Sequence, residues 1–184
     1  MTPAEARTVL AEADLLVGEA ESTAAVRRVA AEINARLGEA NPLVLAVMGG
    51  AVVFAGQLLP QLAFPLDFDY LHVSRYGDVT TGGELAWRVE PRADVSGRCV
   101  LVVDDILDEG ITLAEIRSRL LGQGAREVLT AVFAEKDLER PGHVKPIRAD
   151  FCGVTLPNRY VFGYGMDVKG AWRNLPAVYA VKGM

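Results

Sequence analysis

The sequence predicts an α/β protein built on a parallel β-sheet, with one domain spanning its 184 residues. Short, continuous apolar runs at 43–48, 99–103 and 128–134 are typical of strands that are buried on both faces, as in parallel sheets. Segments with helical periodicity separate these runs, and this alternation is the pattern of βαβ units. Acidic residues crowd after one run, at the strand end where such sheets bind ligands.

Two helices are expected before the first strand. Thr2 and Glu5 can form a capping box that begins the first helix, whose apolar face extends to Leu16. The second helix is expected to follow Ser22 and to end at Gly38, because glycine commonly terminates helices.

The remaining elements follow from the same patterns. Helices are expected at 51–59 and 111–121, and strands at 66–73, 85–89, 151–154 and 160–162. The segment 75–83 is polar and rich in glycine and threonine, so it is expected to be a loop.

Composition narrows the class of partner. Hydrophobic residues make up 51% of the chain, enough for a sizeable core, and Cys99 and Cys152 lie in apolar stretches typical of reduced thiols in a cytoplasmic protein. No apolar run approaches the roughly 18 residues that a membrane helix needs. The net charge of −5 and the lack of a basic cluster disfavour nucleic-acid binding. A small anionic ligand would therefore need a helix N-terminus or a metal.

The segment after the 99–103 strand offers such a site. Four of the six residues from Asp104 to Glu109 are acidic, and Gly110, Ile111 and Thr112 open the next helix. Carboxylates accept hydrogen bonds from sugar hydroxyls and ligate Mg²⁺, and a helix N-terminus binds phosphate, so the segment suits a ribose 5-phosphate. The alternative is a set of helix-capping acids on a surface loop, although crowded carboxylates repel one another.

With these residues identified, the stretch Val100–Leu113 (VLVVDDILDEGITL) resembles the ribose-diphosphate motif of type I phosphoribosyltransferases. After residue 40 the chain resembles the hypoxanthine–guanine branch of that family. The resemblance implies a Rossmann-like parallel-sheet fold with a small hood region and a flexible lid loop. The single domain would comprise N-terminal helices (1–38), the core sheet and lid (39–135), and the base-binding hood with C-terminal strands (136–184).

The resemblance also implies roles for individual residues, with Asp108 as the catalytic residue that takes a purine proton. The ribose and its phosphate would contact Asp104, Asp105, Asp108, Glu109, Gly110, Ile111 and Thr112. Mg²⁺ is the implied cofactor, held by Asp104, Asp105 and Asp167.

Two glycine-rich segments resemble further parts of the family's site. Gly49 and Gly50 match its pyrophosphate loop, with a cis peptide between them, and Arg173 would reach the same diphosphate. The segment 75–83 resembles the mobile lid that keeps water from the reacting centre. An ordinary strand-to-helix turn and a plain hairpin loop are the alternatives.

The base site is matched near the C-terminus. Lys136 resembles the lysine that contacts the purine 6-oxo group, and an ammonium favours an oxo-purine over adenine, whose 6-amino group is a donor. Within LPNRYVFGYGMD (156–167), Tyr160 would stack on the base, Val161 would offer backbone groups, and Asp167 would bind near the base or hold Mg²⁺ through water. A solvated lysine and an aromatic core segment are the alternatives.

The implied reaction joins hypoxanthine or guanine to 5-phosphoribosyl 1-diphosphate, giving IMP or GMP and pyrophosphate in purine salvage. Two alternatives stay open: a phosphoribosyltransferase of another base preference, such as xanthine, and a non-catalytic nucleotide-sensing regulator with the same fold. Neither a nucleic acid nor a membrane is expected as a partner. A homodimer or homotetramer is expected from the family's habits.

The sequence departs from the family pattern at two positions. Glu109 stands where the family usually has Thr or Ser, and a carboxylate beside a phosphate is unfavourable. We therefore expect its side chain to turn away and its N–H alone to serve. Gly49 stands where many relatives carry a larger residue, and the segment through Gly38 matches the family least well.

Overall fold

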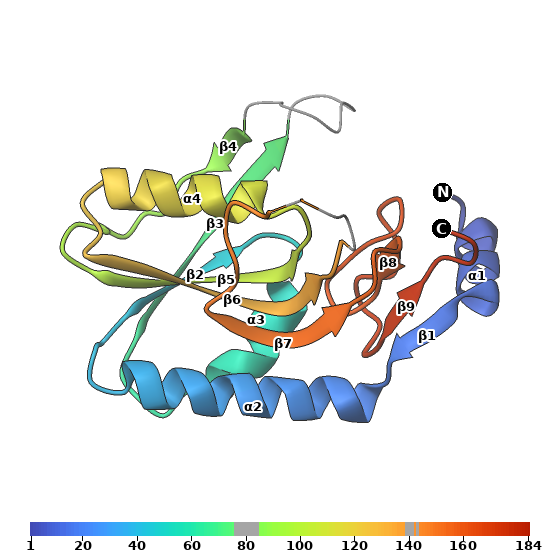
Figure 1. The fold of residues 1–184 in the computed structure, drawn as a ribbon, viewed down its shortest axis with the longest axis horizontal. Coiled ribbons are helices and arrows are strands. Elements are labelled where there is room, and N and C mark those ends of the chain that lie inside the picture. The colour runs from blue at the N-terminus through green and yellow to red at the C-terminus, as the bar shows by residue number, and fades with distance from the viewer. Residues whose placement is uncertain (76–84, 139–141, 143) are drawn as a thin grey trace.

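The fold, taken from a computed structural model that describes residues 1–75, 85–138, 142 and 144–184, is a central sheet covered by helices with a small second sheet beside it (Figure 1). The helices are α1 (Pro3–Glu12), α2 (Glu19–Leu37), α3 (Val52–Leu58) and α4 (Ile111–Gly122), with a 3-10 turn at Leu59–Gln61. The strands are β1 (Asp14–Val17), β2 (Leu43–Val47), β3 (Asp67–Arg75), β4 (Leu85–Val89), β5 (Cys99–Leu107), β6 (Glu127–Lys136), β7 (Phe151–Leu156), β8 (Val161–Phe162) and β9 (Val178–Ala180).

The central sheet has the strand order β4-β3-β2-β5-β6-β7. Its neighbouring strands are parallel except for β3 and β4, which form an antiparallel pair at one edge. The predicted α/β class with a mostly parallel sheet is therefore confirmed. Because parallel strands end at the same edge, the residues after β2, β5 and β6 share one side of the molecule.

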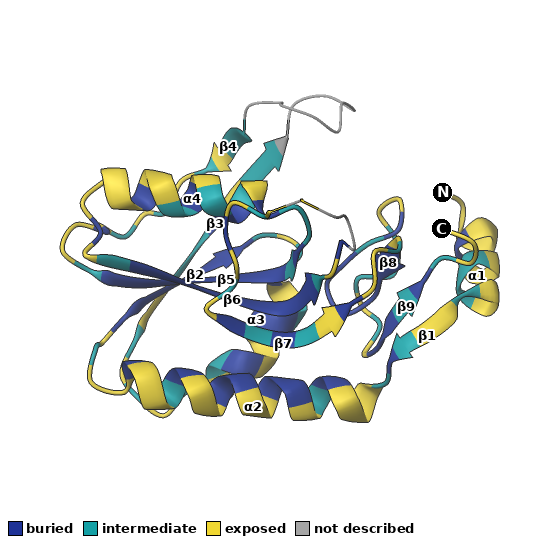
Figure 2. Ribbon diagram, viewed as in Figure 1, coloured by how far each residue is buried: buried dark blue, intermediate teal, exposed yellow. Residues whose placement is uncertain are grey.

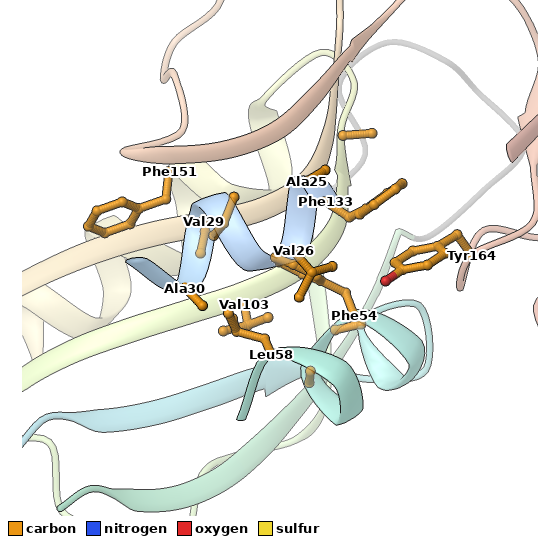
Figure 3. Close-up of a cluster of buried hydrophobic side chains, with 14 of the residues drawn as sticks. Ala25, Val26, Val29, Ala30, Phe54, Leu58, Val103, Phe133, Phe151 and Tyr164 are labelled. Carbon is orange, nitrogen blue, oxygen red and sulfur yellow. The ribbon is translucent and has the colours of Figure 1, made fainter. Parts of the chain in front are cut away.

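Side chains of the central strands alternate between two hydrophobic clusters. Val44 and Ala46 of β2 face the cluster formed with α2 and α3, whereas Leu43 and Leu45 face the cluster formed with α4. Figure 2 shows the central strands as almost wholly buried, which explains their continuous apolar runs. Figure 3 shows Val29 of α2 and other members of the first cluster meeting between the helices and the sheet.

The N-terminal prediction is partly wrong. The capping box is confirmed, because the Glu5 N–H donates to Thr2 Oγ1 (3.3 Å) and the Thr2 N–H donates to Glu5 Oε2 (2.6 Å). The first helix, however, ends at Glu12 instead of continuing to Leu16, and the following residues form β1. Helix α2 begins at Glu19, before Ser22, which the sequence placed ahead of the helix. No helix in the described ranges is long and apolar enough to cross a membrane.

A partner distant in sequence explains the unpredicted strand. Strand β1 pairs antiparallel with β9, with Asp14 opposite Ala180, and β9 pairs antiparallel with β8 to complete the small sheet. Arg159 holds this sheet together, since its guanidinium donates to Asp14 Oδ2 (2.6 Å) and to the Val181 carbonyl (3.0 Å). The two ends of the chain therefore build one unit beside the central sheet (Figure 1).

Two central strands extend beyond their predicted ends. Strands β5 and β6 stay in register from Cys99 opposite Glu127 to Leu107 opposite Glu135. The predicted acidic loop is therefore wrong for its first two acids, because Asp104 and Asp105 belong to β5. Continued pairing with β6 outweighs the low strand propensity of aspartate.

Candidate active site

Two adjacent carboxylates lie out of water at the carboxyl end of β5. Asp104 is 8% exposed and Asp105 is 9% exposed. The Asp105 N–H donates to Asp104 Oδ1 (2.9 Å), and the Ile106 N–H donates to Asp105 Oδ1 (2.8 Å). Burial and repulsion from Asp105 raise the pKa of Asp104 well above its usual range, and burial raises the pKa of Asp105. The ionised form of each carboxylate is therefore disfavoured relative to water.

Two glycines allow the backbone to approach this pair. A Cβ on Gly50 would lie 2.2 Å from Asp105 Oδ2, and a Cβ on Gly165, whose φ is +99°, would lie 2.1 Å from the Gly50 carbonyl oxygen. The loop after β2, the end of β5 and the segment after β8 therefore meet where no side chain fits between them. The cis peptide of this loop joins Met48 to Gly49, so its predicted position at Gly49–Gly50 is wrong.

Arg173 lies between two of the predicted ligand-binding acids. Its Nη1 donates to the Gly165 carbonyl (2.6 Å) and is 4.0 Å from Asp105 Oδ2, while its Nη2 is 2.5 Å from Asp167 Oδ1. The other oxygen of Asp167 accepts the Gly170 N–H (2.7 Å). Residues predicted to bind the diphosphate, the ribose and the base are thus joined in one network.

The predicted metal ligands are not assembled as a three-carboxylate site. Within the ranges that the structure describes, no group of three His, Cys, Asp or Glu side chains could hold a metal ion. Asp104 and Asp105 form a pair, whereas Asp167 is bound to Arg173. A cation at the pair would therefore need ligands from its substrate or from water.

The N-terminus of α4 lies beside the acidic pair. Gly110 is the N-cap with φ +81°, and as a glycine it has no side chain with which to cap the helix. The positive end of the helix dipole favours an anion at this position. A pocket of about 190 Å³ opens here, and its lining comprises Asp104, Ile106, Leu107, Asp108, Glu109, Gly110, Thr112 and Leu113. The N-terminus of α4 and two of the predicted ribose-binding carboxylates, Asp104 and Asp108, thus line one pocket.

The predicted catalytic acid and the predicted base-binding lysine are in direct contact. Lys136 Nζ lies 2.8 Å from Asp108 Oδ2. The Lys136 side chain is 10% exposed and that of Asp108 is 47% exposed, so the carboxylate is the member that solvent reaches more easily. Because β5 and β6 end side by side, residues 28 positions apart form one ion pair.

The predicted base-stacking segment combines one accessible and several buried residues. Tyr160 is 42% exposed, whereas Val161 is 6% exposed within β8. Tyr164 packs inside, where its ring stacks on Phe133 at 3.8 Å and its hydroxyl donates to Gln57 Oε1 (2.7 Å). Burial raises the pKa of Tyr164 to about 12, so it stays protonated and anchors the segment.

One predicted part of the site falls outside the described residues, and one lysine in contact with the site was not predicted. The predicted lid at 75–83 lies outside the described residues, apart from Arg75 at the end of β3. Sequence reasoning did not anticipate Lys145, whose Nζ contacts Glu135 and backbone carbonyls behind the Asp108–Lys136 pair. A lysine whose acceptors are mostly backbone carbonyls gives no local sequence signal.

Comparison with known proteins agrees with this geometry. A family model of the phosphoribosyl transferase domain matches residues 17–169. The chain is 34% identical over 157 residues to a hypoxanthine-guanine-xanthine phosphoribosyltransferase of Tritrichomonas foetus, covering 85% of each protein. It is 31% identical over 169 residues to a hypoxanthine-guanine phosphoribosyltransferase of Streptococcus pneumoniae strain R6, covering 91% of this chain and 92% of the relative.

Solved structures show the same fold. A hypoxanthine-guanine-xanthine phosphoribosyltransferase superposes with a TM-score of 0.81 at 30% identity, covering 92% of this chain and 96% of the other. A Staphylococcus aureus hypoxanthine phosphoribosyltransferase gives a TM-score of 0.86 at 22% identity over 95% of each chain, which supports the fold alone. The chain belongs to the phosphoribosyltransferase family. Its fold is the type I fold of the hypoxanthine–guanine enzymes, as the sequence resemblance implied.

Replacing Gly50 by alanine tests the close approach to Asp105. The new Cβ would overlap the carboxylate, and such overpacking costs about 1–3 kcal/mol, so Gly50→Ala should melt several degrees lower than the wild type. Gly49→Ala is the matched control, because nothing lies within 4 Å of a Cβ there. Equal melting temperatures for the two variants, measured by calorimetry, would contradict the contact.

Removing the charge of Asp104 should stabilise the free protein at neutral pH. The folded state binds this proton more tightly than the unfolded chain, so the free energy of unfolding falls as pH rises above the ordinary value of 3.8. Asp104→Asn keeps an oxygen for the Asp105 N–H and should melt at least ~2 °C higher at pH 7.5, the shift that roughly 1 kcal/mol produces.

The gain should shrink as pH is lowered towards 4, because Asp104 then becomes protonated in the wild type. The exposed Asp94→Asn is the matched control and should change the melting temperature little. A destabilised Asp104→Asn protein at pH 7.5 would show that the carboxylate is favourable in the free enzyme.

Proposed function

We propose that this chain transfers the 5-phosphoribosyl group from 5-phosphoribosyl 1-diphosphate to hypoxanthine or guanine, giving IMP or GMP and pyrophosphate in purine salvage. The contact between Lys136 and Asp108 carries the proposal. It places the lysine expected to bind the purine 6-oxo group next to an acid that lines the candidate ribose-phosphate pocket. The names of the relatives, which are hypoxanthine-guanine enzymes with and without xanthine, support the same base class.

The ribose 5-phosphate is held by the end of β5 and the start of α4. Asp104 and Asp105 accept hydrogen bonds from the ribose hydroxyls, and the backbone N–H groups of Glu109, Gly110 and Ile111 face the phosphate, with the Thr112 hydroxyl as a further donor. The N-terminus of α4, whose N-cap is a glycine, supports this assignment. As C1 of the ribose becomes electron-poor, the two carboxylates favour its developing positive charge.

The cofactor is Mg²⁺, because the donor chemistry of the site fits it. Asp104 and Asp105 offer the oxygen ligands that Mg²⁺ prefers, and their burial without a full positive counterpart favours a cation nearby. Oxygens of the diphosphate, the ribose and water would complete its ligands, and Asp167 would contribute through a water molecule. Bound with the diphosphate, Mg²⁺ supplies charge that neutralises the leaving group.

The leaving diphosphate is bound by the loop after β2 and by Arg173. The C1–O bond to the diphosphate breaks as a purine ring nitrogen bonds to C1. Backbone N–H groups of Gly49 and Gly50 approach the anion closely, since neither residue carries a side chain. Arg173 is already 4.0 Å from Asp105, so it can reach the diphosphate oxygens from its place in the network.

The purine is held between the ends of β5 and β6 and the start of β8. An ammonium has three N–H groups, so Lys136 can donate to Asp108 and to the 6-oxo group together. Tyr160 is exposed enough to stack on the base, and Val161 offers its backbone groups to the base edge. Asp167 lies near the base, held by Arg173.

Asp108 takes the proton that the purine ring nitrogen loses on bonding to C1. The half-exposed carboxylate contacts Lys136, and this contact supports a role as general base for a purine bound to that lysine. The resulting neutral acid keeps its contact with Lys136.

We also propose that the protein is cytoplasmic and forms a homodimer or homotetramer.

Replacing Asp108 by asparagine should lower kcat by about 10²–10⁴-fold, the usual contribution of a general base. Binding of 5-phosphoribosyl 1-diphosphate, measured by calorimetry, should change little, because Asp104 and Asp105 remain. Glu115→Gln on the exposed face of α4 is the control for loss of a nearby carboxylate. Near-normal turnover in Asp108→Asn would exclude the role.

A panel of bases tests the proposed function directly. With Mg²⁺ and 5-phosphoribosyl 1-diphosphate, the wild type should release pyrophosphate with hypoxanthine or guanine at least tenfold faster than with adenine or uracil. Xanthine is included because one relative's name contains it. Release with none of the five bases would contradict an enzymatic function and favour a nucleotide-binding regulator.

In the same assay, Lys136→Ala should raise KM for the base by about tenfold or more, because the loss of a charge-assisted hydrogen bond costs about 1.5–3 kcal/mol. KM for the diphosphate substrate should change by less than about twofold. The exposed Lys182→Ala is the matched control. An unchanged base KM would rule out the contact with the purine.

A further inference from the structure

The side chain of Lys145 lies directly behind the Asp108–Lys136 pair. Its side chain is 7% exposed. Its Nζ donates to the Lys136 carbonyl (2.5 Å) and lies 3.4 Å from both the Leu107 carbonyl and Glu135 Oε1. Three acceptors match the three N–H groups of an ammonium, so the charge is fully used by the protein.

The two carbonyls belong to the ends of the strands that carry the reacting groups. Leu107 is opposite Glu135 at the end of the β5–β6 ladder. Leu107 directly precedes Asp108, and Lys136 is the last residue of β6. One ammonium therefore bonds the main chain on both sides of the ion pair, at the point where the ladder stops holding the two strands together.

The segment that carries Lys145 is also packed against the start of α4. Ile147 is 7% exposed and belongs to the hydrophobic cluster beneath α4. A Cβ on Gly110 would lie 3.2 Å from the Ile147 carbonyl and 3.3 Å from its Cγ2. Because the main chains at Gly110 and Ile147 are this close, the backbone near Lys145 is held in place, as its ammonium is.

A purely structural ion pair does not account for the whole arrangement. Glu135 is 8% exposed and needs a positive partner, but Arg148 also contacts its Oε1 at 3.3 Å from a side chain that is 82% exposed. The two cations thus share one carboxylate, whereas the contacts with the Leu107 and Lys136 carbonyls are made by Lys145. These main-chain contacts are what distinguishes it.

We propose that Lys145 is a positioning residue for base transfer, which holds the Asp108 carboxylate and the Lys136 ammonium in register by bonding the main chain of both strands. The inference rests on the proposed function of this site. Proton transfer needs the base within about 2.6–3.2 Å of the proton donor, and a displacement of about 1 Å can cost 10²-fold in rate. A fixed main chain at Leu107 and Lys136 meets that requirement.

The test compares Lys145→Met with Arg148→Met, since each removes one cation from Glu135. Lys145→Met should lower kcat/KM for hypoxanthine by about tenfold or more, with KM for 5-phosphoribosyl 1-diphosphate changed less than about twofold. Arg148→Met should keep both values within about twofold. Equal kinetic effects in the two variants, or equal losses for both substrates in Lys145→Met, would overturn the proposal.

A double variant separates positioning from stability. Lys145→Met leaves a buried carboxylate with less positive charge and should melt lower, whereas Glu135→Gln/Lys145→Met removes that charge while keeping the side-chain shape. The double variant should regain melting temperature but keep the defect in kcat/KM for the base. Recovery of both together would show that Lys145 acts only through stability.

The wild type, assayed in parallel, distinguishes a failure of the proposed function from a failure of the positioning role of Lys145. If it releases pyrophosphate with hypoxanthine and Lys145→Met does so equally well, the proposed function stands and the positioning role is wrong. If the wild type is inactive with every oxo-purine, the proposed function fails and the positioning role for base transfer fails with it.

Discussion

Asp104 and Asp105 lie side by side, buried, at the end of a central strand, and this crowding of charge constrains the rest of the site. Desolvation disfavours both ionised carboxylates, and repulsion adds to it for Asp104. The structure tolerates the pair because backbone N–H groups and Arg173 partly compensate. Glycine at position 50 is required because a side chain there would overlap Asp105. A site that is unfavourable when free gains most when a ligand supplies positive charge and donors.

The parallel sheet turns this local constraint into a complete binding site. Strands β2, β5 and β6 end at one edge, so the loop after β2, the acidic pair and Lys136 come together without long connections. The helix after β5 adds an N-terminus for phosphate. The segment between β8 and β9 then brings Asp167 to that edge through its contact with Arg173. Arg159 ties the small sheet together. Stability given up at functional positions is a common trade in enzymes.

Local patterns allowed most of the central sheet and the phosphate segment to be predicted. Continuous apolar runs identified β2, β5 and β6, because these strands are buried on both faces. Long-range pairing explains what was missed: β1 finds its partner some 160 residues later, and β5 continues through two aspartates because β6 stays beside it. The role of Lys145 was not predicted for a similar reason, since two of its three acceptors are backbone carbonyls that only the fold brings near it. The cis peptide lies one bond earlier than expected.

A crystal structure with GMP bound tests the central claim most directly. We expect the ribose hydroxyls within hydrogen-bond distance of Asp104 and Asp105, the phosphate at the N-terminus of α4, and the 6-oxo group on Lys136. A nucleotide that binds elsewhere, or one that leaves the acidic pair facing only protein atoms, would contradict the account.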